Sequence, residues 1–477
     1  MSERLRLVLA ALSGLAVTLV LFPVSSAVAS SVLVERTVVP PDGRDPGYTT
    51  AQVMFVADPG ERNVVEVRSD ATGLTITDGG SSIRAGVGCT SLDGGGARCE
   101  VVGSASLASG VVELGDSADS ATADINGAVD ALTIDGGADD DVLRSSGTIS
   151  VSLQGGEGAD DLRALGPRGS SLSGGAGNDT LVGADGNDQL QGGPGTDRLD
   201  GGTGSDTASW TDSSRAVHVD LGRGSGGPAD ELDHLNNVEN IIGSSAPDFL
   251  VGSDGPNRIS GGQAGIGPGD RIYGLDGDDE LSGGRDNDHI EGGSGNDQIT
   301  GGGGSDFADA GPGRDIVRLT GSGGTVSGGA GDDDLATMLD SPKARAHRMV
   351  CDAGDDIAGS FGRAVIASNC ERGSIGLYDL RYPRLRSDRQ ITLTQLRRPT
   401  GILNTCNRLT IRTPSGRTLA DRIVTRYPTQ ITTHPITGPV PTKVTVRIDL
   451  LGDSCRRRTD PRGQTAVVNL RRPAGMP

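Results

Sequence analysis

Aromatic side chains are scarce in this 477-residue chain, which holds five phenylalanines, five tyrosines and one tryptophan. The core of a large enzyme is usually built from aromatic and branched side chains, so this shortage argues against one. Histidine is also rare, with five residues scattered singly, and neither the H-E-x-x-H pattern of zinc proteases nor the G-x-S-x-G pattern of serine hydrolases occurs. We therefore expect no enzymatic activity.

Long apolar runs are missing after residue 29. The one early run, residues 7–22, follows two arginines and precedes the small-residue sequence Ala27-Val28-Ala29. This order predicts a secretory signal peptide, residues 1–29, with cleavage after Ala29. A membrane anchor is the alternative, but 16 apolar residues are fewer than the roughly 20 needed to span a bilayer. We expect a secreted, extracellular or cell-surface protein with no transmembrane segment after cleavage.

Six cysteines fit an oxidising compartment. They allow 15 pairings, and none of their spacings is the C-x-x-C of a structural zinc site. The cysteines fall in three pairs that are local in the sequence, and we expect a disulfide within each pair: Cys89 with Cys99, Cys351 with Cys370, and Cys406 with Cys455.

Positive charge is scarce over most of the chain. Between residues 30 and 342 acids outnumber bases by 52 to 17, a net charge of −35, whereas residues 343–477 hold 10 acids and 24 bases. The acidic region excludes nucleic acid as its partner and favours cations, because carboxylates at this density repel one another unless they are neutralised. Outside a cell, calcium is the obvious candidate.

Glycine, with 77 residues, is abundant and periodic. From Gly174 the chain reads GGAGNDTLV, GADGNDQLQ, GGPGTDRLD and GGTGSDTAS, and a second run of nine-residue units starts at Gly274. Weaker copies begin at residues 136, 155, 243, 252 and 328, and an irregular insertion surrounds GGQAGIGPGDRI. A fixed nine-residue period predicts a solenoid.

The sixth position of the unit is almost always aspartate. Gly-rich turns can bring backbone carbonyls together and this residue adds charge, which suits a calcium ion that takes six to eight oxygen ligands. The predicted metal ligands are Asp160, Asp179, Asp188, Asp197, Asp206, Asp248, Asp270, Asp279, Asp288, Asp297, Asp306, Asp315 and Asp333, with Asn257 at this position in one weak unit.

The eighth position is aliphatic, as in Leu181, Leu190, Leu199, Leu281, Ile290, Ile299 and Val317, or alanine in Ala208 and Ala308. One short strand and one turn bury nothing alone, but two units per coil can stack into a narrow two-sided solenoid. Turns eighteen residues apart should then share each cation. The expected pairs are Asp179 with Asp197, Asp188 with Asp206, Asp279 with Asp297, Asp288 with Asp306, and Asp297 with Asp315.

The unit resembles the repeats-in-toxin (RTX) nonapeptide, G-G-x-G-x-D-x-U-x, over roughly residues 136–335. The resemblance implies an all-β fold, a parallel β-roll filled with several calcium ions. In the weak unit at Gly136, Asp139 replaces a glycine, so we expect a poorly shaped turn at Asp141, with at most one neighbouring partner.

The flanking segments read as further β-structure. Residues 64–68 and 74–80 alternate apolar and polar side chains, and SLDGGGAR lies between Cys89 and Cys99 as a hairpin turn. Segments 391–396, 408–412, 443–450 and 465–470 suggest a small basic β-sandwich. The predicted organisation is 1–29 signal peptide, 30–135 N-terminal β-rich cap, 136–340 β-roll, 341–375 disulfide-closed cap and 376–477 basic domain.

These observations predict a secreted calcium-binding protein. One alternative is a cell-surface adhesin or matrix protein, stiffened by calcium, whose basic runs grip anionic cell-wall polymer, another surface protein or its own acidic solenoid. Another is a polysaccharide-acting enzyme with an unrecognised site. A metal or catalytic role for His218 and His234 is conceivable, but solvated histidines in a loop or bulged coil fit the sequence better.

Overall fold

The computed structural model describes residues 30–39, 48–100, 107–127, 129–262, 268–339, 345–354, 356–361 and 363–366, and beyond these the strand segments 372–375, 378–385, 391–397, 406–412, 418–424, 430–432, 443–452 and 464–469. Every regular element in these ranges is a β-strand, so the predicted all-β class is confirmed. Nowhere in them is there a helix long and apolar enough to cross a membrane. The predicted signal peptide lies outside the described residues. The chain forms two compact units, Met1–Ser173 and Gly174–Pro477.

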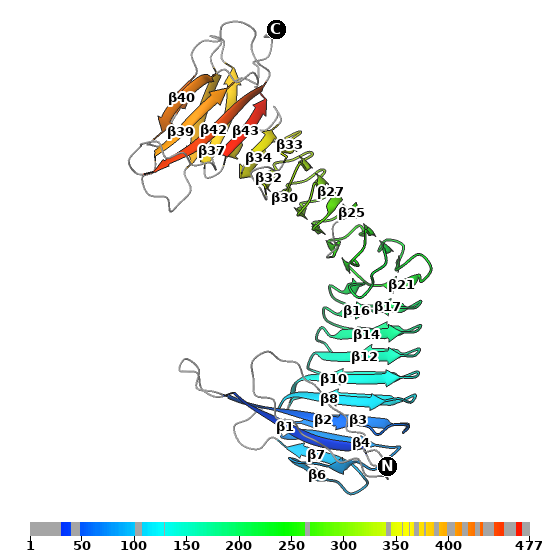
Figure 1. Ribbon diagram of the computed structural model, residues 1–477. Helices are drawn as coiled ribbons and strands as arrows, with labels where there is room; N and C mark the ends of the chain where they lie inside the picture. Colours follow the sequence, from blue (N-terminus) through cyan, green and yellow to red (C-terminus); the bar gives the residue numbers. More distant parts are fainter. Residues whose placement is uncertain are drawn as a thin grey trace, which may run out of the picture. The chain divides into compact units, whose positions relative to one another are not determined.

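The first unit begins with mainly antiparallel strands (Figure 1). They are β1 (Ser31–Val39), β2 (Tyr48–Val56), β3 (Val64–Asp70), β4 (Gly73–Asp78), β5 (Arg84–Ala85), β6 (Cys89–Ser91) and β7 (Ala97–Glu100). The predicted strands at 64–68 and 74–80 correspond to β3 and β4. Their inward-facing residues, such as Val67 and Ile76, are fully buried, which explains the alternating pattern.

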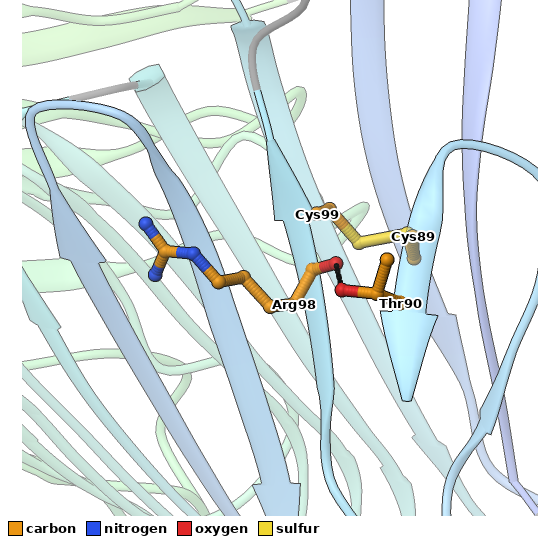
Figure 2. The surroundings of a disulfide bond; sticks show 4 residues. All are labelled: Cys89, Thr90, Arg98 and Cys99. Carbon is orange, nitrogen blue, oxygen red and sulfur yellow. Dashed lines mark hydrogen bonds between the residues drawn. A yellow bond between two sulfur atoms is a disulfide. The ribbon is translucent and has the colours of Figure 1, made fainter. Parts of the chain in front are cut away.

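A disulfide joins the neighbouring strands β6 and β7. Figure 2 shows the bridge between Cys89 and Cys99, whose Cα atoms are 4.1 Å apart. The glycine-rich turn between them is closed by the backbone N–H of Leu92, which donates to the carbonyl of Gly96 at 2.7 Å. The predicted stapled hairpin and its local disulfide are therefore confirmed.

Parallel coiling starts within the first unit. Its strands are β8 (Leu107–Gly115), β9 (Ser120–Ile125), β10 (Val129–Ala138), β11 (Val142–Gly147), β12 (Val151–Glu157) and β13 (Asp161–Ala164), followed by β14 (Ser171–Ala176) at the division between the units. β2, β8, β10 and β12 lie side by side in one sheet, and β3, β9, β11 and β13 in a second. Residues 111–115 belong to β8, and residues 116–119 connect it to β9 in the first coil.

The second unit continues the pattern with strands of two to nine residues, many of them three residues long (Figure 1). They are β15 (Thr180–Val182), β16 (Gln189–Gln191), β17 (Arg198–Asp200), β18 (Thr207–Ser209), β19 (His218–Asp220), β20 (Ser225–Gly226), β21 (Asp233–Asn236), β22 (Asn240–Ile242), β23 (Phe249–Val251), β24 (Arg258–Ser260), β25 (Pro268–Asp276), β26 (Glu280–Gly284), β27 (Asn287–Ser294), β28 (Gln298–Gly302), β29 (Phe307–Asp309), β30 (Ile316–Gly321), β31 (Thr325–Ser327), β32 (Asp334–Leu339), β33 (His347–Val350), β34 (Ile357–Phe361), β35 (Arg363–Ile366) and β36 (Arg372–Ile375).

Two sheets alternate along this part of the chain. β26 pairs in parallel with β28, and β27 with β29, so that Leu281 faces Ile299 and Ile290 faces Ala308. Each of these strands therefore pairs with the strand eighteen residues further on, as predicted for a two-sided coil. All the aliphatic residues predicted for position eight are buried. They form two thin rows of side chains, because alternate residues of a strand point to opposite faces.

The chain ends in strands that pair mainly antiparallel: β37 (Tyr378–Leu385), β38 (Ile391–Arg397), β39 (Cys406–Arg412), β40 (Thr418–Val424), β41 (Gln430–Thr432), β42 (Lys443–Gly452) and β43 (Gln464–Asn469). β37, β38 and β41 make one set of antiparallel neighbours, and β39, β40, β42 and β43 another. The four strands predicted here from alternating sequence fall on β38, β39, β42 and β43, in agreement with a small sandwich-like domain.

Peptide mapping without reduction tests the remaining cysteines. Cys351 is disulfide-bonded, but its predicted partner Cys370 lies outside the described residues, as does Cys455. We expect three local bridges, Cys89–Cys99, Cys351–Cys370 and Cys406–Cys455, because each pair falls within one predicted structural region. A bridge that joins two regions, or a free thiol in protein made under oxidising conditions, would contradict local pairing.

Candidate metal centre

The position-six aspartates of neighbouring coils are linked by hydrogen bonds. In the regular coils, the backbone N–H of one aspartate donates to Oδ1 of the aspartate eighteen residues on. The distances are 2.8 Å for Asp179 to Asp197, 2.7 Å for Asp188 to Asp206, 2.9 Å for Asp279 to Asp297, 3.2 Å for Asp288 to Asp306 and 2.8 Å for Asp297 to Asp315. All five predicted pairs are therefore neighbours, and we call this series of bonds the carboxylate ladder.

The second carboxylate oxygen has no such partner in most of these turns. Oδ2 is buried without a hydrogen bond in Asp197, Asp206, Asp279, Asp288, Asp297, Asp306, Asp315 and Asp333. Burial of a charged oxygen that nothing compensates is costly, and a neighbouring cation removes that cost. In these eight turns the ladder thus leaves one carboxylate oxygen available to a metal ion.

A backbone carbonyl from the next coil approaches the region beside this Oδ2 atom. If Gly292, at position one of its unit, carried a Cβ, that atom would lie 2.4 Å from Asp297 Oδ2 and 2.4 Å from the carbonyl oxygen of Ala310. The corresponding distances at Gly274 are 2.2 Å to Asp279 Oδ2 and 2.4 Å to the carbonyl oxygen of Gly292. The residues present therefore fit calcium, which prefers carboxylate and carbonyl oxygens in a flexible arrangement.

Side chains alone do not make these sites. Within the described ranges no three His, Cys, Asp or Glu side chains gather closely enough to hold a metal ion. Backbone carbonyls can complete such a ligand set, and the turns are shaped to supply them. Gly293 and Gly295 have φ angles of +112° and +140°, which are strained for other residues, and a Cβ on Gly295 would lie 1.9 Å from the carbonyl oxygen of Gly277.

Position five has a role that the sequence analysis missed. Oδ1 of Asp278 accepts a hydrogen bond from the backbone N–H of Asn296 at 2.7 Å, and Oδ1 of Asn296 accepts one from Arg314 at 3.0 Å. Asn178, Asn187 and Asn287 bond the next coil in the same way. The recurrence of Asn or Asp immediately before the position-six aspartate was the available signal.

Burial raises the pKa of the ladder carboxyls. The pKa is raised to about 7 in Asp197, Asp270, Asp306 and Asp315, and to about 6 in Asp279, Asp288 and Asp333. Desolvation is the largest cause, opposed by the hydrogen bond from the preceding coil and reinforced by neighbouring acids. Without a cation, these carboxyls in the folded turns therefore stay protonated to a higher pH than an ordinary aspartate does.

The weaker predicted units also join the ladder. Oδ1 of Asp160 accepts from the N–H of Asp141, and Oδ1 of Asp333 accepts from Asp315. Asp270 keeps the geometry despite the irregular insertion before it, since its Oδ2 and the carbonyl oxygen of Gly283 lie 2.0 and 2.5 Å from a Cβ placed on Gly261. Asp248 differs because protein donors already reach both of its oxygens.

The expectation for Asp141 is wrong. Its Oδ1 accepts from the N–H of Asp119 at 2.7 Å while its own N–H donates to Asp160, so it has a partner on each side. The turn keeps its shape because Asp139, where a glycine was expected, adopts a φ of +72°, in the left-handed region that aspartate tolerates better than most residues.

Asp233 and Asp356 also belong to the ladder and were missed because insertions interrupt the period. Asp233 accepts from Asp197, and Asp356 accepts from Asp333. Asp356 could have been recognised from the sequence, since Gly354, Asp356 and Ala358 keep the spacing of positions four, six and eight. His218 and His234 are exposed, as expected, but they lie in the short strands β19 and β21 rather than in loops.

These features define the class of protein: a parallel β-roll whose stacked turns hold buried carboxylates and converging carbonyls. The model of the RTX calcium-binding nonapeptide repeat matches the chain in four copies, at residues 173–208, 242–264, 269–290 and 282–317. The chain thus contains RTX repeats, as the sequence resemblance indicated, and these imply a calcium-binding β-roll. Among curated proteins, none matches the chain.

Substitution of Gly292 by alanine tests the space between carboxylate and carbonyl. The added methyl group would overlap both Asp297 Oδ2 and the Ala310 carbonyl, so we expect weaker calcium binding and a loss of roughly 1–3 kcal/mol in stability from overpacking. Gly255→Ala is the matched control, because a Cβ there meets nothing within 4 Å. Equal calcium affinities of the two variants, measured by calorimetric titration, would contradict the assigned position of the site.

The raised pKa values predict how the calcium-free protein responds to pH. A carboxyl whose pKa is higher in the folded than in the unfolded state binds its proton more tightly when folded, so stability falls as pH rises from about 4 to about 7. We expect calcium-depleted protein to show more β-structure by circular dichroism at about pH 4.5 than at about pH 7.5. The opposite order would show that the carboxyls are not desolvated in the metal-free coil.

Proposed function

We propose that this is a secreted, non-enzymatic protein whose β-roll folds on binding several calcium ions. The observation that supports this most directly is the repeated buried Oδ2 atom without a hydrogen-bond partner, next to a carbonyl of the following coil. When bound, calcium supplies positive charge at that position. The protein supplies Oδ2 and carbonyl oxygens there, while Oδ1 remains engaged in the ladder.

The proposed ligands are the thirteen aspartates predicted from the sequence, now joined by Asp141. Asp248 should contribute least, since both of its oxygens already accept hydrogen bonds from Val217 and Ser244. We also propose that residues 30–135, which include the first parallel strands β8 and β9, cap a β-roll of residues 136–340 and that residues 341–375 close its other end.

Folding should depend on calcium because little else holds the short coils. Each three-residue strand buries one aliphatic side chain, worth about 1.5–3 kcal/mol for Val, Leu or Ile, and ordering a residue's backbone costs about 1–2 kcal/mol. Acid groups outnumber basic ones by 52 to 17 between residues 30 and 342. Cations that bind the folded state and not the unfolded state shift the folding equilibrium towards the folded coils by mass action.

A second candidate is a calcium-stiffened adhesin or matrix protein. Its support is the change of charge along the chain, with 24 bases against 10 acids in residues 343–477. Such a basic segment could bind anionic cell-wall polymer or another surface protein. Wall binding that survives removal of calcium from the folded protein would favour this function.

Calcium titration followed by circular dichroism tests the proposal, with Asp297→Ala as the informative variant. We expect the calcium-depleted protein to gain β-structure cooperatively, and magnesium to substitute poorly because it requires tight octahedral coordination. Asp297 bonds both Asp279 and Asp315. Its loss should raise the calcium concentration at the midpoint on the order of tenfold and reduce cooperativity.

Asp254→Ala is the control for loss of charge alone. Asp254 is an exposed acid in the same solenoid and lies outside the ladder, so the variant should titrate like the parent. If the parent folds fully with chelator present, or if the two variants shift equally, the carboxylate ladder is not the calcium site.

A further inference from the structure

The solenoid is interrupted by an excursion after β18. Residues 210–232 interrupt the regular order of the coils and include β19 and β20. β20 pairs antiparallel with both β19 and β21, whereas β19 pairs in parallel with β23 of the solenoid. The chain then returns to register, so that β21 takes the place beside β17, with Leu199 opposite Leu235. The next coil follows with Ala208 opposite Ile241.

At this point the ladder continues through an aspartate whose two carboxylate oxygens are both hydrogen-bonded. Asp233 stands 36 residues after Asp197, from whose backbone N–H its Oδ1 accepts a hydrogen bond at 2.9 Å. Its Oδ2 accepts a second hydrogen bond, at 3.0 Å, from the indole Nε1–H of Trp210. Asp233 is 1% exposed and Trp210 is 3% exposed. The oxygen that is unpartnered in the regular coils is therefore satisfied here by the protein.

The excursion is built to hold the indole in that position. A Cβ on Gly226 would lie 2.7 Å from the Trp210 ring, so the absence of a side chain there makes room for it. Val217, Val219 and Leu235 are buried in the same segment. This is more apolar packing than a regular coil has.

The next ladder positions are satisfied in the same way. Ser244 donates to both oxygens of Asp248, from its backbone N–H at 2.6 Å and its hydroxyl at 2.8 Å. Asn257, which carries no charge, accepts from the N–H of Ser253 at 2.7 Å and donates to the carbonyl of Glu239 at 2.7 Å. Within the described part of residues 210–262, no ladder side chain has a buried oxygen that lacks a hydrogen bond.

We propose that residues 210–260 form a calcium-independent segment of the β-roll, in which Trp210 closes the carboxylate of Asp233 to cations. The segment separates two groups of calcium-dependent coils, one before β18 and one after β24. This inference rests on the proposed function, because it assumes that the regular coils need calcium. It also implies that the segment is the ordered region from which both groups of coils grow when calcium is added.

The chain has a single tryptophan, so its fluorescence reports on this segment alone. In the full-length protein, calcium removal by a chelator should abolish most of the β-signal in circular dichroism while Trp210 emission stays at the short wavelength of a buried indole. Addition of denaturant should then shift the emission to long wavelength. An emission that shifts together with the loss of β-signal on chelation would overturn the proposal.

Calcium counting with two matched variants gives an independent test. Asp233→Asn and Asp306→Asn each remove one buried ladder carboxylate, but only Asp306 has an unpartnered Oδ2. By equilibrium dialysis we expect Asp306→Asn to lose at least one bound calcium ion and Asp233→Asn to bind as many as the parent. An equal loss in both variants would overturn the proposal.

The two tests separate this inference from the function on which it rests. A parent protein that binds no calcium would overturn the proposed function and this inference with it. A parent that folds on binding calcium, with Trp210 emission following the folding, would leave the proposed function intact and overturn this inference alone.

Discussion

The hydrogen bond from one position-six backbone N–H to the carboxylate of the next coil fixes the geometry on which the rest of the β-roll depends. It places one oxygen of each carboxylate in a continuous ladder and directs the other towards a backbone carbonyl, as at Asp297 and Ala310. Coils in such a stack lie about 4.8 Å apart, so the same geometry repeats negative charge at short intervals. Stable packing and cation binding are thus two consequences of one arrangement.

The turns, rather than the core, therefore dominate the energetics of the coils. Some coils bury only an alanine at the centre of a strand, as at Ala208 and Ala308, which accounts for the small share of large side chains in the composition. The few aromatic rings are used differently. His218, Phe249, Tyr273, His289 and Phe307 follow one another along the outer side of one sheet, with ring centroids 4.7–6.1 Å apart. Contacts of this kind add modest stability between coils.

Much of this arrangement could be predicted from the sequence. Each nonapeptide specifies both the turn that carries the aspartate and the short strand that follows it. The nine-residue period predicted the two rows of buried aliphatic side chains and the pairing of Asp279 with Asp297, eighteen residues apart. Prediction failed where the period is broken but the backbone recovers. Asp233 was missed because a folded excursion precedes it, and Asp141 was misjudged because an aspartate can adopt the turn conformation of a glycine. Trp210 gave no signal, since a hydrogen bond between residues 23 positions apart leaves no periodic trace.

The alternation of strands between two sheets also limits how such a gene can change in length. Duplication or loss of one nine-residue unit moves every later strand to the opposite sheet relative to the strands before it. A change of eighteen residues preserves this parity, since β26 and β28 occupy one sheet and β27 and β29 the other. Unequal recombination should therefore be tolerated mainly in steps of two repeats, and related genes should differ by whole coils.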